Sequence, residues 1–413
     1  MSVSSLSKML TAAVAATALY ALPISGAEAQ GYDEGGIRAG AFMIYPEASV
    51  TETYNDNVFA ADVGAAPPAS IESDFITTLA ASVSAESGWS RHALNLNAGL
   101  TQLFYEDNTG DDRFGWNIGA DGRVDITRDT SVSAGLSYTQ THEDRDFPDA
   151  VANAAEPTEF SVLQADISLD HRFNRVTTRV GVGYADYDYD NVPLVGGGVL
   201  VQDDRDYERF SQLVQLGYDV SPDTNVYIRG TLNQRKYDQQ PPVVATDRDS
   251  DGYSVVGGAE FRVTNLVRGG VYAGYQEQSY DNPALPEISG LSYGANIDWS
   301  ATPLTTVRLE AAATIEETTA VGASGFLSQS VGVGIDHELT RDVIVGARAS
   351  YGNNDYEGVA RSDDIIRAGA GVDYLINRNF SVGVAYDYTE RSSNVPGLDF
   401  DRNEVGLTLK AKL

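Results

Sequence analysis

Apolar and polar residues alternate with a period of two along most of the chain, and residues 380–413 show this most clearly. The positions between the apolar ones are small, polar or charged. Because successive side chains of a β-strand point to opposite faces, the pattern predicts a hairpin of two strands, each with one apolar face. The apolar positions of its two arms are Phe380, Val382, Val384, Tyr386 and Tyr388, then Val405, Leu407, Leu409, Ala411 and Leu413.

Short turns rich in Thr, Ser, Asn, Pro and Asp recur at intervals of 37 to 47 residues. Side chains of these types bond their own backbone and so favour tight turns. Eight turns join nine hairpins, which predicts 18 strands, with 16 as the runner-up count. The predicted turns lie at 87–91, 127–130, 174–177, 221–224, 264–265, 302–303, 340–343 and 377–380.

The connections between these turns are longer, more variable and rich in Asp, Asn, Gly and Pro. They lie at about 60–73, 107–112, 143–158, 189–204, 238–250, 281–287, 317–325, 353–361 and 390–399. Short turns at one end and long polar loops at the other are typical of a barrel in an outer membrane. The sequence therefore predicts an all-β protein, an antiparallel transmembrane β-barrel with short periplasmic turns and long extracellular loops. A soluble solenoid or propeller also has repeats of this length, but its connections would not alternate in this way.

The ends of the predicted barrel should meet. We expect the first strand over 42–54 and the last over 404–413, and their pairing would close the ring. Pro46 lies inside the first strand, where its missing N–H removes one hydrogen bond from the ladder. We therefore expect a tolerated defect or a bulge at the seam. Lys410 and Lys412 should face the periplasmic mouth.

The two faces of the predicted strands differ in charge. One parity carries apolar residues such as Leu94, Leu96, Val180, Val331 and Val333 and would face lipid, where Arg or Lys at the bilayer midplane costs roughly 2–4 kcal/mol. The other parity mixes both signs of charge with Gly, Ser, Thr and Asn, as expected for the wall of a water-filled lumen. The candidate lumen residues are Arg123, Arg179, Arg229, Arg268, Arg308, Arg348, Arg367, Asp121, Asp166, Glu260, Asp298, Glu310 and Asp373.

These lumen charges admit two interpretations. As a selectivity lining, fixed positive charges would favour anionic or hydroxyl-rich solutes, with the facing carboxylates setting a transverse field. As structural groups, the arginines would pair with carboxylates on neighbouring strands and stiffen the wall. The sequence leaves both open.

Aromatic residues gather near both ends of the predicted strands, as in the two interfacial girdles of membrane barrels. Towards the short turns lie Trp89, Phe173, Trp299, Tyr374 and Phe380. Towards the long loops lie Tyr54, Phe104, Tyr105, Tyr138, Tyr184, Tyr187, Tyr237, Tyr253, Tyr275, Tyr351, Tyr386 and Tyr388.

Composition and the first residues agree with export. Residues 1–29 have a short basic start, an apolar run and an Ala27-Glu28-Ala29 cleavage site, as in a cleaved signal peptide. Residues 30–41 would form a loosely ordered periplasmic lead-in, and 42–413 the barrel. A net charge of −31 disfavours nucleic acid as a partner, and the lack of cysteine excludes disulfides and thiolate metal sites. We expect an outer-membrane location, with lipid, lipopolysaccharide and the barrel-assembly machinery as partners and no cofactor or metal.

Two kinds of outer loop invite separate hypotheses. The acidic loops at 143–146, 203–206 and 247–251 are either solvated or recruit divalent cations that bridge to lipopolysaccharide; the solvated state is expected. The apolar, glycine-rich stretch within 189–204 either folds inward to narrow the pore or extends a hairpin beyond the membrane. An enzyme is not expected: His142, beside Glu143, is the only candidate base, and no nucleophile elbow or zinc spacing accompanies it.

Near its start the chain carries Tyr45-Pro46 followed by the box Glu52-Thr-Tyr-Asn-Asp-Asn-Val-Phe59. With these motifs it resembles the beta-barrel porin 2 family, and the resemblance extends over the mature chain. Members of this family often look like the outer-membrane component of exopolysaccharide export systems. The resemblance implies a polysaccharide conduit that works with periplasmic export components. It carries over no catalytic residues, and the final Leu413 departs from the Phe on which outer-membrane proteins usually end.

The sequence therefore favours a porin-like barrel with an aqueous channel and a mixed-charge lumen. An exopolysaccharide conduit is an overlapping hypothesis. A structural or surface-anchoring barrel with an occluded lumen is the alternative from another class, and a barrel enzyme is the last.

Overall fold

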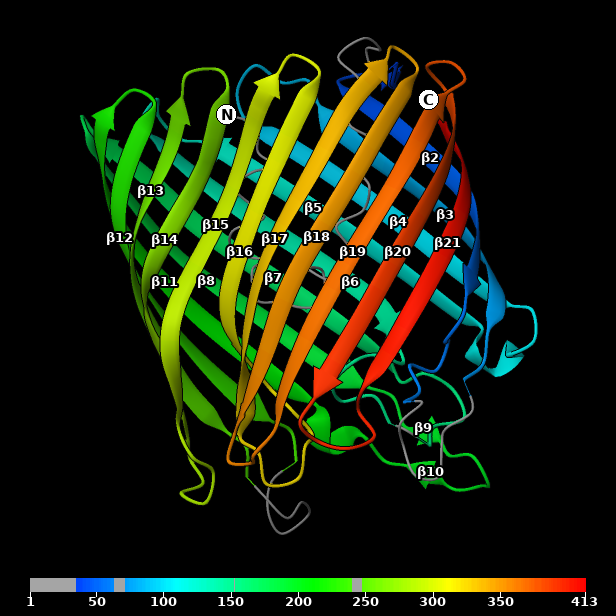
Figure 1. The fold of residues 1–413 in the computed structure, drawn as a ribbon. Coiled ribbons are helices and arrows are strands. Elements are labelled where there is room, and N and C mark those ends of the chain that lie inside the picture. Colours follow the sequence, from blue (N-terminus) through cyan, green and yellow to red (C-terminus); the bar gives the residue numbers. More distant parts are fainter. Residues whose placement is uncertain (1–34, 63–70, 152, 240–246) are drawn as a thin grey trace.

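The computed structural model describes residues 35–62, 71–151, 153–239 and 247–413. The predicted signal peptide lies outside these residues. Eighteen long antiparallel strands follow one another around a closed barrel (Figure 1). They are β2 (Phe42–Asn55), β3 (Asp74–Ser87), β4 (Ala93–Tyr105), β5 (Arg113–Asp125), β6 (Thr130–His142), β7 (Glu159–Phe173), β8 (Val176–Tyr189), β11 (Tyr207–Ser221), β12 (Thr224–Tyr237), β13 (Ser250–Val263), β14 (Val267–Tyr280), β15 (Ile288–Thr302), β16 (Thr305–Glu316), β17 (Gly325–Thr340), β18 (Val343–Glu357), β19 (Ser362–Leu375), β20 (Phe380–Ser393) and β21 (Phe400–Lys412).

The predicted class and strand count are confirmed, and each of the eight predicted turns joins two neighbouring strands. In Figure 1 these turns lie at the top and the long connections at the bottom. Two long connections are shorter than predicted: β18 continues to Glu357 and β20 to Ser393. Their last residues are polar on both faces, so hydropathy gave no sign that the ladder goes on.

β21 pairs with β2 and closes the ring, as predicted, from Glu47↔Lys412 to Asn55↔Glu404. The expected bulge at Pro46 is absent, since the register of β2 with β3 runs through Pro46↔Val83 without a shift. Leu413 donates its backbone N–H to the carbonyl of Pro46 at 3.1 Å. The N and C=O of one strand residue point the same way, so the missing N–H faces the β21 edge, beyond the last residue pair there. Pro46 therefore costs the β2–β3 ladder nothing.

The described part of the lead-in, 35–41, is more ordered than predicted, and 30–34 lie outside the described residues. Residues Ile37–Ala39 form a short strand, β1, which pairs with the start of β2 from Ile37↔Ile44 to Ala39↔Phe42. Alternate residues of β2 face this edge, so β1 continues the line of β21 past Pro46. The seam thus ends in a small hairpin on the short-turn side.

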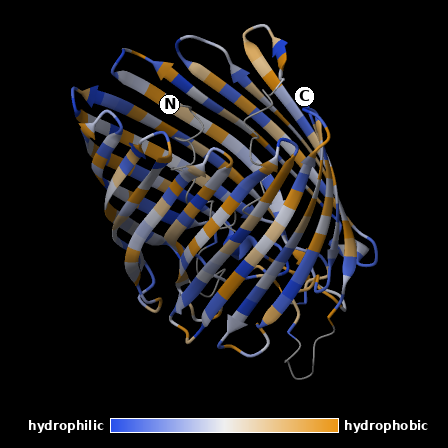
Figure 2. Ribbon diagram, turned by 45° about the horizontal axis from the view of Figure 1, so that its top comes forward, coloured by the Kyte–Doolittle hydropathy of each residue, from blue (hydrophilic) through white to orange (hydrophobic). Residues whose placement is uncertain are grey.

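The outer and inner walls follow the predicted parity. Large apolar side chains such as Leu96, Leu136, Val180, Leu291 and Val331 are exposed on the outside. Figure 2 shows apolar and polar residues alternating along the strands in view. Charged residues of the opposite parity therefore line the interior. No helix in the described part of the chain has the length and hydropathy needed to span a membrane.

The aromatic girdle towards the long loops is partly confirmed. On the outer wall, tyrosine hydroxyls donate to carboxylates, as from Tyr184 to Glu208 at 2.9 Å and from Tyr351 to Asp364 at 2.6 Å. The assignment of Tyr105, Tyr187 and Tyr237 to this girdle was wrong: they are buried on the inner wall. Their positions at the long-loop ends of the strands suggested the rim, but they belong to the alternating set whose side chains point inward.

Candidate functional site

Ion pairs line the inner wall nearer the short turns. Five of the seven candidate lumen arginines pair with a carboxylate. The distances are 3.1 Å for Arg123–Asp125, 2.7 Å for Arg179–Asp170 and 3.0 Å for Arg268–Asp298; Arg308 pairs with Asp336 and Arg348 with Asp387. Most of these pairs link neighbouring or next-neighbouring strands, so they fit the structural interpretation of the lumen charges.

The other two candidate arginines have different surroundings. The Arg229 guanidinium lies 5.5 Å from the ring centre of Tyr227 and 4.9 Å from that of Tyr272, which suits cation–π attraction. Arg367, on β19, lies towards the long-loop end, where its charge acts on Asp146. These two arginines are therefore placed differently from the five ion-paired ones. We call those five ion pairs the girdle pairs and their part of the inner wall the girdle.

The candidate acidic residues also lie on the inner wall. Asp121 and Asp166 lie on either side of Gly135, since a Cβ there would meet their Oδ1 atoms at 3.3 and 2.6 Å. Asp373 lies against Gly383, and Asp298 pairs with Arg268. Glu260 faces Asn225 of β12 in the register, and Glu310 faces Asn296 of β15. Sequence reasoning thus found wall residues, which do not converge on one point.

A different set of residues converges at the long-loop end. The loop 143–158, between β6 and β7, reaches across the barrel end towards strands that lie five to seven places from β6 round the ring. Asp146 Oδ2 lies 3.1 Å from Arg402 of β21, and Arg391 of β20 donates to the Asp146 carbonyl at 3.1 Å. Arg361, just before β19, donates to the carbonyl of Pro148 at 3.5 Å. We call this set of contacts the latch.

Electrostatics support the latch. Burial by itself raises the pKa of the Asp146 carboxyl, but Arg402, Arg367 and Arg391 together hold it below its ordinary value. The Asp146 side chain is 12% exposed. Removing its cationic partners would leave a mostly buried carboxylate uncompensated, which is expensive. The latch therefore depends on charges from β19, β20 and β21.

The base of the same loop is also tied down. Arg145 grips both carboxylate oxygens of Asp111 at 2.6 and 3.0 Å and donates to the Ala154 carbonyl. Glu143 and Arg205 form a pair that is buried on both sides, with side chains 2% and 9% exposed. Desolvation raises the pKa of Glu143 above its ordinary value, with Arg205 working against the rise. The expectation of a solvated acidic loop at 143–146 is therefore wrong for Glu143 and Asp146, which pair with distant arginines, while Asp144 is 68% exposed.

A second connection, 317–324 between β16 and β17, folds against the first. Thr318 donates to Asp149 at 2.7 Å. Arg235 of β12 pairs with Glu317 and donates to the Ile315 carbonyl at 3.0 Å. The long-loop end of β16 has separated from β15, because their pairing stops at Gly294↔Ala312. The two connections thus meet inside the barrel end.

The glycine-rich loop takes the second of its two predicted courses. Val192–Pro193 (β9) and Val199–Leu200 (β10) form a small hairpin at the long-loop end (Figure 1). Its tip is open to solvent, with Val195 70% and Val199 62% exposed. The hairpin also touches the latch loop, through an Ala154↔Leu194 bridge. The narrowing element is therefore 143–158, and the stretch in 189–204 supports it from outside.

The candidate base, His142, lies beside a carboxylate of the next strand. His142 Nε2 lies 3.3 Å from Glu159 on the adjacent strand. Over the described residues, no three His, Cys, Asp or Glu side chains are grouped closely enough to hold a metal ion. The contacts across the barrel end include arginine–carboxylate pairs, such as Arg402–Asp146 and Arg205–Glu143. The sequence shows an acidic loop and, elsewhere, arginines at strand ends. Nothing in either segment indicates that the two are in contact.

Solved structures of outer-membrane proteins are similar to this chain. The outer membrane protein OpdK of Pseudomonas aeruginosa is 12% identical over 90% of this chain and 99% of its own, with a TM-score of 0.43. OccK3 (OpdO) of the same species is 14% identical over 90% of this chain and 95% of its own, with a TM-score of 0.44. The siderophore receptor PiuA of Acinetobacter baumannii is 10% identical over 92% and 82%, with a TM-score of 0.47. These values are too low to transfer a substrate.

None of the curated proteins compared with the chain matches it. The family described as "Putative beta-barrel porin 2", in contrast, matches residues 30–413. That range includes the whole barrel, from the lead-in to the closing strand, and confirms the resemblance seen at the opening box. This porin-like outer-membrane β-barrel belongs to that family.

Proposed function

We propose that the protein is a gated outer-membrane channel whose passage is set by the latch loop. One observation carries the proposal. The loop 143–158 is held across the barrel end by ion pairs rather than by an apolar core, as in the contact of Asp146 with Arg402. A loop held by a few charged contacts can pass those charges to water when it moves out, whereas a packed apolar plug would have to expose its apolar surface. The constriction is therefore suited to open and close.

The proposed cargo is hydroxyl-rich, with exopolysaccharide as the leading case. The family resemblance motivates this choice, and a polar inner wall supports it. Periplasmic export components would deliver the polymer at the short-turn end. The barrel-assembly machinery and lipopolysaccharide remain the expected partners of the outer wall.

The same loops favour a second candidate, a structural barrel with an occluded lumen. The contact between Thr318 and Asp149 joins the two inward connections to each other. If those contacts never open, the barrel would anchor or organise the surface without conducting. Conductance separates the two functions.

The test is single-channel recording in planar bilayers. We compare the parent protein with a variant carrying both Arg391→Ala and Arg402→Ala. The matched control is Arg268→Ala, which removes an arginine from a girdle pair at the other end. Release of the latch should raise the open conductance several-fold, while the control leaves it nearly unchanged. Heat-modifiable migration on gels checks that each barrel is folded.

Folded protein that passes no current in either form would contradict the channel and support the occluded barrel. The polysaccharide role has a separate readout. Deleting the gene should abolish secreted polysaccharide without a general permeability defect. Normal secretion in the deletion strain would remove exopolysaccharide as the cargo.

A further inference from the structure

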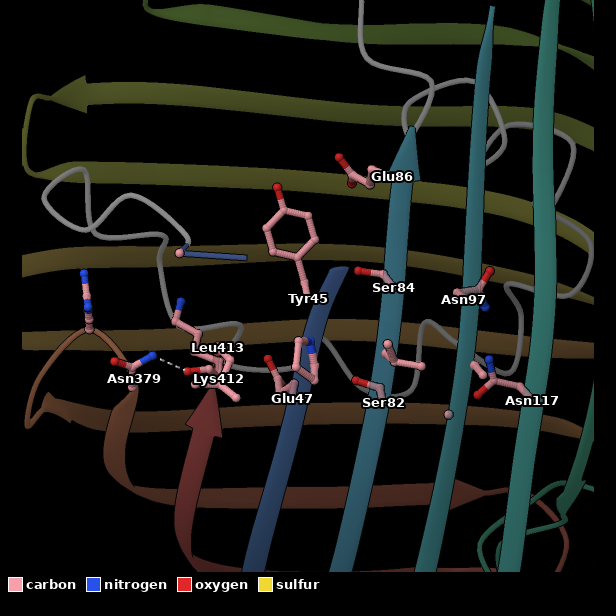
Figure 3. A pocket seen from close by; sticks show the side chains of 16 residues that line it. Tyr45, Glu47, Ser82, Ser84, Glu86, Asn97, Asn117, Asn379, Lys412 and Leu413 are labelled. Atoms are coloured by element: carbon pink, nitrogen blue, oxygen red, sulfur yellow. Dashed lines mark hydrogen bonds between the residues drawn. The ribbon is translucent and has the colours of Figure 1, made fainter. Parts of the chain in front are cut away.

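A cavity of about 350 Å³ lies on the inner wall at the short-turn end, against β2, β3, β4 and β5. Its volume is within the range of about 300–1,000 Å³ that small-molecule sites occupy. Figure 3 shows Tyr45 and Glu47 of β2, Ser82, Ser84 and Glu86 of β3, Asn97 of β4 and Asn117 of β5 around it. Most of these groups are uncharged hydrogen-bonding side chains.

A second cavity of about 140 Å³ continues the first along the wall, towards the long loops. The two share Ser82 and Asn117, and the second adds Ser49 of β2 and Thr101 of β4. Ser49 and Thr101 lie further along their strands, towards the long loops. Together the cavities form a strip that starts at the short-turn mouth and runs along the strands. We call it the neutral track, made up of Ser49, Ser82, Ser84, Asn97, Thr101 and Asn117.

The polar side chains of the track have unused hydrogen-bonding capacity. Within the described ranges, those of Ser82, Ser84, Asn97 and Asn117 form no hydrogen bond with another residue. The wall opposite has paired charges, such as Arg268–Asp298 and Arg308–Asp336. A ligand on the neutral track replaces only water, whereas one on the opposite wall must compete with existing ion pairs.

The shape of the track depends on two glycines. A Cβ at Gly119 would stand 2.6 Å from Asn97 Oδ1, and one at Gly99 would stand 2.6 Å from Asn117 Oδ1. Each asparagine amide therefore lies flat across the glycine of the neighbouring strand. A larger residue at either position would push an amide into the passage. The result is a shallow wall with amides presented along it.

We propose that the neutral track binds the uncharged, hydroxyl-rich chain of a saccharide during its passage; this rests on the proposed channel function. Amides and hydroxyls both donate and accept, so they match the hydroxyls of a sugar ring in either sense. Tyr45 adds an aromatic side chain at the mouth. Four charged groups, two of each sign, also line the larger cavity: Glu47, Glu86, Arg378 and Lys412. Of these, Glu47 is held by Lys410 at 2.7 Å. The strip runs along the barrel, as a linear polymer needs.

The test is block of the ion current by defined oligosaccharides added on the periplasmic side. The probes are maltohexaose and cellohexaose, which are neutral, and hexagalacturonate, which is anionic. The test variant carries Asn97→Ala and Asn117→Ala. The control is Asn296→Ala: Asn296 is an exposed inner-wall asparagine on β15, nine strands from β4 in either direction round the ring of 18. The control thus has the same chemistry on the opposite wall.

At least one neutral probe should block the parent channel, and the double variant should weaken that block about tenfold, as expected for the loss of two hydrogen bonds. The open conductance of the double variant and the block in Asn296→Ala should stay near the parent values. Equal loss of block in the control, or stronger block by hexagalacturonate than by either neutral probe, would overturn the track while the channel stands.

If the parent carries no current, the channel proposal fails, and binding is measured by calorimetry with the same probes on the detergent-folded barrel. Heat of binding that is lost in Asn97→Ala with Asn117→Ala and kept in Asn296→Ala supports the site without transport. No heat from either neutral probe would remove the site as well.

Discussion

The inner wall of β2–β5 and the wall opposite it differ in what their side chains bond to. On the opposite wall, charges such as Arg268 and Asp298 satisfy each other. On the β2–β5 wall, uncharged groups such as Asn97 and Ser82 line cavities with no partner in the described chain. Charge density alone would have placed the binding surface on the wrong side. What a ligand can use is the hydrogen-bonding capacity that the protein leaves unused.

The prediction with the largest expected effect tests which strand faces are inner and which are outer. Val333→Arg puts a cation on the outer face of β17, where it costs roughly 2–4 kcal/mol near the bilayer midplane. The folded barrel should be strongly reduced in membranes, as measured by heat-modifiable migration. Ser330→Arg, on the inner face of the same strand, is the control and should assemble. Equal tolerance of both changes would contradict the assigned faces.

The next effect sharpens the contrast between the latch and the girdle. Asp146→Asn removes the carboxylate charge that pairs with Arg402, while the contact of Arg391 with the Asp146 backbone carbonyl remains. Breaking a buried pair from one side costs about 3–5 kcal/mol, so the loop should spend much more time away from the wall. Single-channel records should show a several-fold higher mean conductance. The control, Asp298→Asn in the girdle, should change the mean conductance little. A larger change in Asp298→Asn than in Asp146→Asn would contradict a gating role for the loop.

Acid should act in opposite directions on two carboxyls of the loop 143–158, Glu143 and Asp146. The pKa of Glu143 is raised by desolvation, so the inward loop takes up a proton there more readily than the free chain and is favoured as pH falls. The pKa of Asp146 is lowered by its arginines, so its contribution is present above the ordinary Asp value near 3.9 and is lost as pH falls through the lowered value. Conductance should therefore stay constant or fall from pH 7 to about 5. It should rise only below about pH 4.

In Glu143→Gln the first part of this profile should flatten while the rise at low pH remains. In Asp146→Asn the rise should disappear. Conductance that increases steadily from pH 7 downward would show that neither carboxyl acts as assigned.

The smallest effect concerns a girdle pair at the short-turn end. The Arg268 side chain is 72% exposed, and ion pairs in such solvent-exposed positions contribute about 0–1 kcal/mol. Arg268→Ala should leave thermal stability almost unchanged and shift the reversal potential slightly towards cations. A loss of assembly would mean that the girdle does far more structural work than its exposure suggests.

The sequence predicted the barrel because its determinants are local. Alternation set the strands and faces, turn residues set the hairpins, and the count of turns set the ring. The latch was out of reach, because Arg402 and Asp146 are 256 positions apart and neither lies in a recognisable motif. The composition of 143–146 is that of a solvated loop, and only its distant arginines make it a buried one.

The neutral track was missed for a related reason. Candidate residues were chosen by charge, as with Arg308 and Glu310. The serines and asparagines of β3–β5 have the composition expected of any lumen wall and were therefore not singled out. Their significance depends on having no partner, which a sequence does not record. The same holds for Tyr187 and Tyr237, whose inward direction follows from a parity that their position near the rim obscured.

Pro46 has a further consequence at the seam. Two strands that pair along regular alternating patterns can slide past each other by two residues and keep the same faces together. Sliding of β21 towards the start of β2 would have to exchange hydrogen bonds with Pro46, which offers an acceptor but no donor at that edge. The absent N–H of Pro46 thus disfavours one direction of register shift between β2 and β21. This is the pair of neighbouring strands whose register no connecting turn fixes.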